Sequence, residues 1–165
     1  PDVIIPRAAV AVTVRLSPPH EDEDPKWLLV KRGKEPNKGR WSICGGSIEG
    51  LESTMDAAKR ELFEETKLGG HSANLRWHEG GPFTSSDAIA PPYHYVISQC
   101  FAEIRISEPG EPSLSPSDDA MDADWWTHED VVEGERKGEM SPGVSAVLRR
   151  ANNLHINGFL PCADA

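Results

Sequence analysis

The sequence has few cysteines and no long apolar run. Its three cysteines, Cys44, Cys100 and Cys162, are far apart and show no Cys-x-x-Cys spacing. A disulfide framework and a zinc-binding motif are therefore not indicated. Free thiols are typical of a reducing compartment, so we expect a cytoplasmic protein. The longest apolar runs, near residues 8–12 and 95–97, are far too short for a transmembrane helix.

Basic residues are also scarce. The chain has 17 lysines and arginines against 27 aspartates and glutamates, which gives a formal charge of −10. This balance argues against binding to polymeric nucleic acid and against adsorption to an anionic membrane. It leaves open a local basic cluster that binds a small phosphorylated ligand. Because 165 residues show no internal repeat and no boundary, we expect residues 1–165 to form one domain.

Valine-rich and alternating segments predict several strands around one central helix. The first strand (4–16) is followed by an acidic, proline-rich segment (17–26) that we expect to be an exposed hairpin loop. This order of elements indicates an α/β (α+β) sandwich. The other predicted elements are strands over 27–31, 41–43, 71–79, 93–106 and 122–127, and helices over 53–68 and 144–152.

The predicted central helix carries three glutamates on one face. Glu61, Glu64 and Glu65 have the spacing i, i+3, i+4, so they lie close together on a helix. Each pair of like charges costs roughly 0.2–0.5 kcal/mol without a partner, and a cation would remove that cost. Oxygen ligands alone favour a hard divalent ion such as Mg²⁺ or Mn²⁺. A solvated acidic helix face is the alternative interpretation of the same pattern.

Residues around the glutamates favour the metal interpretation. We predict a turn at Gly45-Gly46, because glycine permits the close approach of a backbone carbonyl to an ion. Arg60 and Glu52 are placed where an ion pair between them would fix the carboxylates. The pattern therefore predicts a metal-binding site at this helix.

Eight positions of this segment match a known sequence motif. They are Gly46, Glu52, Arg60, Glu61, Leu62, Glu64, Glu65 and Leu68, and they resemble the Nudix hydrolase box Gx5Ex7REUxEExGU, where U is aliphatic. The flanking segments WLLVKRG, GRWSICGG and DADWW are also similar to the family. The resemblance implies a Nudix-type α/β/α sandwich with a mixed central sheet and a catalytic loop-helix motif.

The resemblance also implies roles for individual residues. In the family, Mg²⁺, or Mn²⁺ as a substitute, is held by groups that match Glu61, Glu64, Glu65 and the carbonyl of Gly45. Arg60 would orient a glutamate carboxylate, and Glu52 would bind Arg60 or a metal-bound water. A helix-capping acid is the alternative interpretation of Glu52.

The general base and the phosphate contacts are less specified by the motif. The base is Glu64, Glu65 or an acid of the later loop 117–124, where we favour Asp119. An exposed turn is the alternative interpretation of this acidic loop, since aspartate and serine are common in turns. Lys31 and Arg32 end a predicted strand before the metal segment, and we expect them to contact substrate phosphates, or else to be solvated.

One position departs from the family pattern. Lys67 stands where the family has glycine near the helix end, and we expect Gly69 or Gly70 to end a slightly longer helix instead. Ser53 or Thr54 would cap the other end. No charged position of the motif is lost, so we expect activity to be retained.

The substrate is inferred from the resemblance alone. The flanking segments are most similar to the ADP-ribose-pyrophosphatase-like group, which implies hydrolysis of the pyrophosphate bond of ADP-ribose or a nucleotide sugar. A nucleoside triphosphate pyrophosphohydrolase that removes damaged nucleotides is the first alternative. A non-catalytic nucleotide-binding module is the second. Many relatives dimerise, so a homodimer stays open as the assembly.

Overall fold

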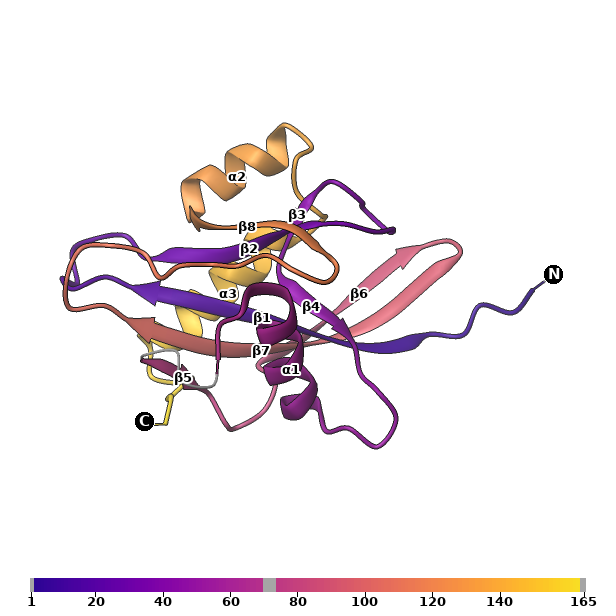
Figure 1. Ribbon diagram of the computed structural model, residues 1–165, viewed down its shortest axis with the longest axis horizontal. Coiled ribbons are helices and arrows are strands. Elements are labelled where there is room, and N and C mark those ends of the chain that lie inside the picture. The colour runs from indigo at the N-terminus through magenta and orange to yellow at the C-terminus, as the bar shows by residue number, and fades with distance from the viewer. Residues whose placement is uncertain (1, 70–73, 164–165) are drawn as a thin grey trace.

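The computed structural model describes residues 2–69 and 74–163. Its helices pack on both faces of a central sheet (Figure 1). No helix in the described ranges is long and apolar enough to cross a bilayer. The elements are β1 (Arg7–Ser17), β2 (Lys26–Arg32), β3 (Trp41–Ser42), β4 (Cys44–Ser47), α1 (Thr54–Thr66), β5 (Leu75–Trp77), β6 (Thr84–Ala90), β7 (Tyr93–Arg105), β8 (Ala120–Thr127), α2 (His128–Arg136) and α3 (Val144–Ile156).

The sheet is mixed, as predicted. Strand β1 runs parallel to β7 along its whole length, and the other pairings are antiparallel. The order is β3-β2-β1-β7-β5, with β4 on β1, β6 on β7 and β8 on β2. Strand β1 therefore pairs with β2 near its C-terminal end and with β4 in its first half. Strands β2 and β4 thus pair with different parts of the same edge of β1.

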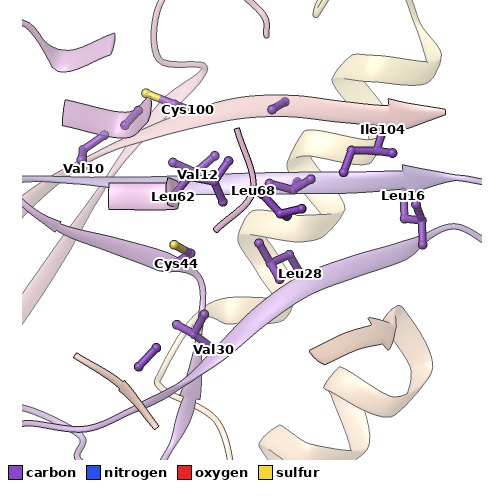
Figure 2. Close-up of a cluster of buried hydrophobic side chains, with 14 of the residues drawn as sticks. Val10, Val12, Leu16, Leu28, Val30, Cys44, Leu62, Leu68, Cys100 and Ile104 are labelled. Atoms are coloured by element: carbon purple, nitrogen blue, oxygen red, sulfur yellow. The ribbon is translucent and has the colours of Figure 1, made fainter. Parts of the chain in front are cut away.

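The core follows the two-residue period of the strands. In β1, Val10, Val12 and Val14 face α1, whereas Ala11 belongs to the cluster that packs on α3. Figure 2 shows the α1 side, where Leu62 and Leu68 meet the side chains of β1 and β2. Because β1 is covered on both faces, its sequence is a nearly continuous apolar run.

The hairpin loop and the two predicted helices are confirmed, but three elements, β4, β6 and α2, were not predicted. Strand β6 (Thr84–Ala90) consists mostly of small and polar residues, and it forms because β7 offers a partner along its whole length. Helix α2 buries only Val131 and Gly134, so its apolar stripe is too short to stand out in the sequence.

Two predicted strands are shorter than expected. The first begins at Arg7, and the preceding Ile4 and Ile5 are exposed. Within the described part of the strand predicted over 71–79, which is 74–79, Leu75–Trp77 is the strand that pairs with β7. Residues 71–73 lie outside the described part of the chain.

Helix α1 begins as predicted and ends differently. Ser53 is the N-cap, and its hydroxyl accepts a hydrogen bond from the Asp56 N–H at 3.1 Å. The helix is not extended to Gly69. Lys67 itself takes the left-handed conformation (φ 63°) and its N–H bonds to Phe63 O. The chain must reverse here because Leu68 is buried in the core. The predicted alternative, Gly70, lies outside the described residues.

The left-handed Lys67 leads to a stability prediction. A side chain in this conformation costs about 1 kcal/mol, and glycine avoids that cost. We expect Lys67→Gly to raise the Tm by roughly 2–4 °C in a thermal melt. Lys67→Ala, which removes the same charge but keeps the Cβ, is the control and should give no gain. An equal gain in both variants would show that the charge, not the backbone, is responsible.

A buried carboxylate ties β7 to β1 and α3. Glu103 is 1% exposed, and its oxygens lie 2.8 Å from Ser17 Oγ, 2.9 Å from His155 Nε2 and 2.7 Å from Arg105 Nε. Burial by itself raises the pKa of Glu103, but the hydrogen bonds from His155, Ser17 and Arg105 outweigh it and lower the pKa to about 2. The network therefore favours the ionised form.

This network predicts a loss of stability in acid. In the unfolded chain the pKa of a glutamate is about 4.3. The stabilisation is therefore complete above that pH and is lost as the pH falls towards 2. We expect Glu103→Gln to lower the free energy of unfolding by roughly 2–3 kcal/mol at pH 7. In urea titrations this difference should fall to about half at pH 3. A difference that does not change with pH would contradict the prediction.

Candidate active site

Strand β4 brings its backbone against both β1 and α1. Gly45 and Gly46 lie in this strand, opposite Ala11 and Val10 of β1, so the predicted turn is wrong. A Cβ at Gly45 would collide with the Val10 carbonyl, and a Cβ at Gly46 would collide with the Glu61 carboxylate. Close approach therefore requires glycine at position 45, where the colliding atoms are backbone, whereas the Glu61 side chain beside Gly46 could shift. The strand forms because its backbone pairs with β1, and the local sequence does not reveal this distant partner.

Two glutamates of α1 are buried beside β4. Glu61 is 8% exposed and Glu65 is 5% exposed. Burial, together with the charge of Glu61, raises the pKa of Glu65 to about 7, and burial also raises the pKa of Glu61. Glu65 Oε2 accepts hydrogen bonds from Cys44 Sγ at 3.1 Å and from Gly45 N at 3.3 Å, both neutral donors. Cys44 is fully buried.

Arg60 connects the other carboxylates of the motif. Its Nε and Nη2 bond to the two oxygens of Glu52 at 2.7 and 2.9 Å, which is the ion pair expected from the sequence. Its Nη1 lies 2.9 Å from Glu61 Oε1 and 3.1 Å from Glu64 Oε2, and Nη2 donates to the Ser47 carbonyl at 3.0 Å. The hydrogen bonds from Arg60 lower the pKa of Glu52 to about 2. One guanidinium thus sets the position of three carboxylates.

The donor set suits a hard divalent ion. Glu65 is a buried carboxylate whose described hydrogen bonds come only from neutral groups, and Glu61 beside it adds repulsion. Two buried carboxylates that repel each other are stabilised by a cation, and oxygen donors select Mg²⁺ or Mn²⁺. Within the described residues, no three His, Cys, Asp or Glu side chains already converge as metal ligands. Arg60 holds one oxygen each of Glu61 and Glu64, and the second oxygen of each carboxylate makes no hydrogen bond with Arg60.

A cavity of about 560 Å³ borders these glutamates. Glu61, Glu65 and the glycines of β4 line one part of its wall, and Arg32 from the end of β2 lines another. Arg32 Nε donates to the Pro36 carbonyl at 2.6 Å, which fixes its side chain at the cavity. Lys31 and Glu64 lie outside this wall.

Asp119 lies in the cavity wall and pairs with a lysine. Its Oδ2 is 2.6 Å from Lys34 Nζ, and its carbonyl accepts the Gly33 N–H at 2.8 Å. The hydrogen bond to Asp119 raises the pKa of Lys34. Sequence reasoning did not find Lys34, which follows Gly33 in a polar loop that has no signal of its own. The pair joins the loop after β2 to the loop before β8.

Comparison with known proteins places the chain in a family. It belongs to the Nudix family, since the family model described as NUDIX domain matches residues 6–149. Among curated proteins it is 35% identical over 105 residues to an ADP-ribose pyrophosphatase of Methanocaldococcus jannaschii. That match covers 64% of this chain and 56% of the relative, so the chain matches little more than half of the relative's length.

Solved structures share the fold at low sequence identity. A C. elegans Ap4A hydrolase in a binary complex has a TM-score of 0.71 and 16% identity, over 92% of this chain and 98% of that one. The NUDIX domain of Shewanella oneidensis NrtR, complexed with ADP ribose, has a TM-score of 0.65 and 18% identity, over 90% and 88% of the two chains. These likenesses confirm the predicted Nudix-type sandwich.

Proposed function

We propose that this chain is a Mg²⁺-dependent hydrolase that cleaves the pyrophosphate bond of a nucleoside diphosphate derivative, either ADP-ribose or a nucleotide sugar. The observation that carries the proposal is the pair of buried carboxylates, Glu61 and Glu65, at the wall of a cavity that also exposes Arg32. The curated relative named ADP-ribose pyrophosphatase and the ADP-ribose complex of the NrtR domain support the substrate class.

The roles proposed for the metal-site residues are those that the resemblance to the family implies. Glu61, Glu64, Glu65 and the Gly45 carbonyl are proposed to hold the ion, with Mn²⁺ as a substitute. When bound, a divalent ion neutralises charge on phosphoryl oxygens and makes a bound water more acidic. Arg60 positions Glu61 and Glu64 through its hydrogen bonds, and Glu52 anchors Arg60.

Glu65 is the preferred general base. Its carboxylate lies in the cavity wall, where it can take a proton from a water that attacks the substrate. Asp119 lies in the same cavity, but its ion pair with Lys34 favours a role in holding two loops together. Arg32 is proposed to contact a substrate phosphate, since a guanidinium bonds phosphate oxygens with two N–H groups. A phosphate contact by Lys31 stays a prediction.

A non-catalytic nucleotide-binding module is the second candidate. The observation in its favour is that Arg60 holds oxygens of both Glu61 and Glu64, so the ligands are not already arranged around an ion. The nucleoside triphosphate pyrophosphohydrolase, the homodimer and the cytoplasmic location stay predictions.

A substrate panel separates these functions. The purified protein is incubated with Mg²⁺ or Mn²⁺ and with ADP-ribose, nucleotide sugars, dinucleotides and nucleoside triphosphates, and phosphate is measured after added phosphatase. We expect release from ADP-ribose or a nucleotide sugar, with AMP or another nucleoside monophosphate as one chromatographic product, and none in EDTA. Release from triphosphates alone would favour the first alternative. A folded protein that binds these nucleotides and cleaves none would favour the binding module.

A further inference from the structure

The cavity extends from the α1 glutamates to the opposite face of the sheet. Gln99 in β7 lies between Ile97 and Phe101 in the strand, and both of these side chains pack on the α3 side. Ser141 lies just before α3. Both Gln99 and Ser141 are in the cavity wall. The cavity therefore has a second polar region, separate from the carboxylates.

Gln99 and Ser141 are buried without complete hydrogen bonding. Gln99 is 4% exposed and Ser141 is 8% exposed. Gln99 Nε2 donates to Ser86 Oγ at 3.3 Å, whereas Gln99 Oε1 and Ser141 Oγ have no hydrogen-bond partner among the described residues. A buried unpaired polar atom destabilises a protein and calls for an explanation. Two such atoms in the wall of one cavity indicate a ligand that bonds to both.

The surroundings define the kind of group that fits. Ala11, Ile97 and Val147 give this part of the wall apolar surface, which suits the face of a flat ring. The register aligns Gly45, Ala11 and Gln99 across three neighbouring strands. The Cα atoms of Gly45 and Gln99 are therefore about 10 Å apart. Because the carboxylates and this polar region line one cavity, a sugar and a phosphate can lie between the ring and the carboxylates.

We propose that Gln99 and Ser141 form a nucleobase site that selects adenine over hypoxanthine. With its Nε2 on Ser86, Gln99 presents Oε1 as an acceptor, which complements the exocyclic amine of adenine. Hypoxanthine has a carbonyl at that position, so two acceptors would face each other. Ser141 Oγ can donate to a ring nitrogen. This inference rests on the proposed function in one respect, which is that the ligand is a nucleotide.

Equilibrium binding of AMP and IMP tests this site. Neither nucleotide has a phosphoric anhydride bond, so calorimetric titration in the presence of Mg²⁺ measures binding without hydrolysis. We expect the wild-type protein to bind AMP about tenfold more tightly than IMP. Gln99→Met, which keeps the length of the side chain, should remove that preference. Ser141→Ala should weaken the binding of both nucleotides. Equal affinities in the wild type, the opposite order, or no measurable binding would overturn the proposal.

Thermal stability separates recognition from a structural role. Both variants remove an unpaired buried atom, so their Tm in the absence of nucleotide should be unchanged or higher by about 2–4 °C. Thr13→Val is the matched control, since Thr13 Oγ1 is also buried and unpaired but lies outside the cavity wall. It should leave the affinity for AMP unchanged. A large drop in Tm for Gln99→Met would indicate a structural role. Gln99-dependent AMP binding without hydrolysis of any substrate would refute the proposed function and leave this site standing.

Discussion

Glu65→Gln is expected to lower kcat for pyrophosphate hydrolysis by about 10³-fold or more, because it removes both a proposed metal ligand and the preferred general base. The amide has the same size as the carboxyl and can still accept the Gly45 N–H. The fold should therefore persist, and in EDTA the Tm should be equal or higher, since a buried carboxylate is removed. Steady-state kinetics and a thermal melt of the same preparation check both parts.

Glu108→Gln provides the control for this change. Glu108 is exposed in the loop after β7, and the same substitution there should leave kcat and Tm unchanged. If Glu65→Gln kept more than a tenth of the wild-type kcat, Glu65 would be neither the base nor a necessary ligand. Asp119 would then be the next candidate.

Arg60→Lys is expected to lower kcat by about 10²-fold, although the positive charge is kept. A single ammonium cannot bond to both oxygens of Glu52 and also reach Glu61 and Glu64, which Arg60 contacts with its planar fork. Displacement of the carboxylates by about 1 Å is enough for a loss of this size. We expect the Mg²⁺ concentration for half-maximal rate to rise as well, whereas KM for the substrate should change little.

The matched control is Arg136→Lys in α2. Arg136 also bonds a glutamate with two nitrogens, at 2.9 and 2.6 Å from the oxygens of Glu133, but on the exposed surface. This variant should keep the wild-type kcat and Mg²⁺ dependence. If Arg60→Lys had the same small effect as Arg136→Lys, the Arg60 contacts would not position the metal-site carboxylates.

Local patterns predicted the elements that carry the site. The spacing of Glu61, Glu64 and Glu65 on one helix depends only on the helical repeat. The start of α1 depends on a hydroxyl at Ser53 that caps the neighbouring N–H. The apolar run of β1 and the acidic loop after it were likewise visible, because burial on both faces and exposure each leave a local composition.

Features that depend on distant partners were not predictable. Gly45 and Gly46 are in a strand because β1 pairs with them, and Lys67 is left-handed because Leu68 must enter the core. The same limit applies to β6, which forms on the edge of β7. In each case a long-range contact overrides the preference of the local sequence.

The sequence by itself determined the motif, the acidic helix face and the α/β class, since these depend on residue order and periodicity. Only the tertiary structure decided which residues share the cavity. It placed Arg32 in the wall and Lys31 outside, and it brought Gln99 of β7 and Ser141, which precedes α3, into the wall of the same cavity. The physical reason is that strand pairing and helix packing bring together atoms whose separation along the chain carries no information about their distance in space.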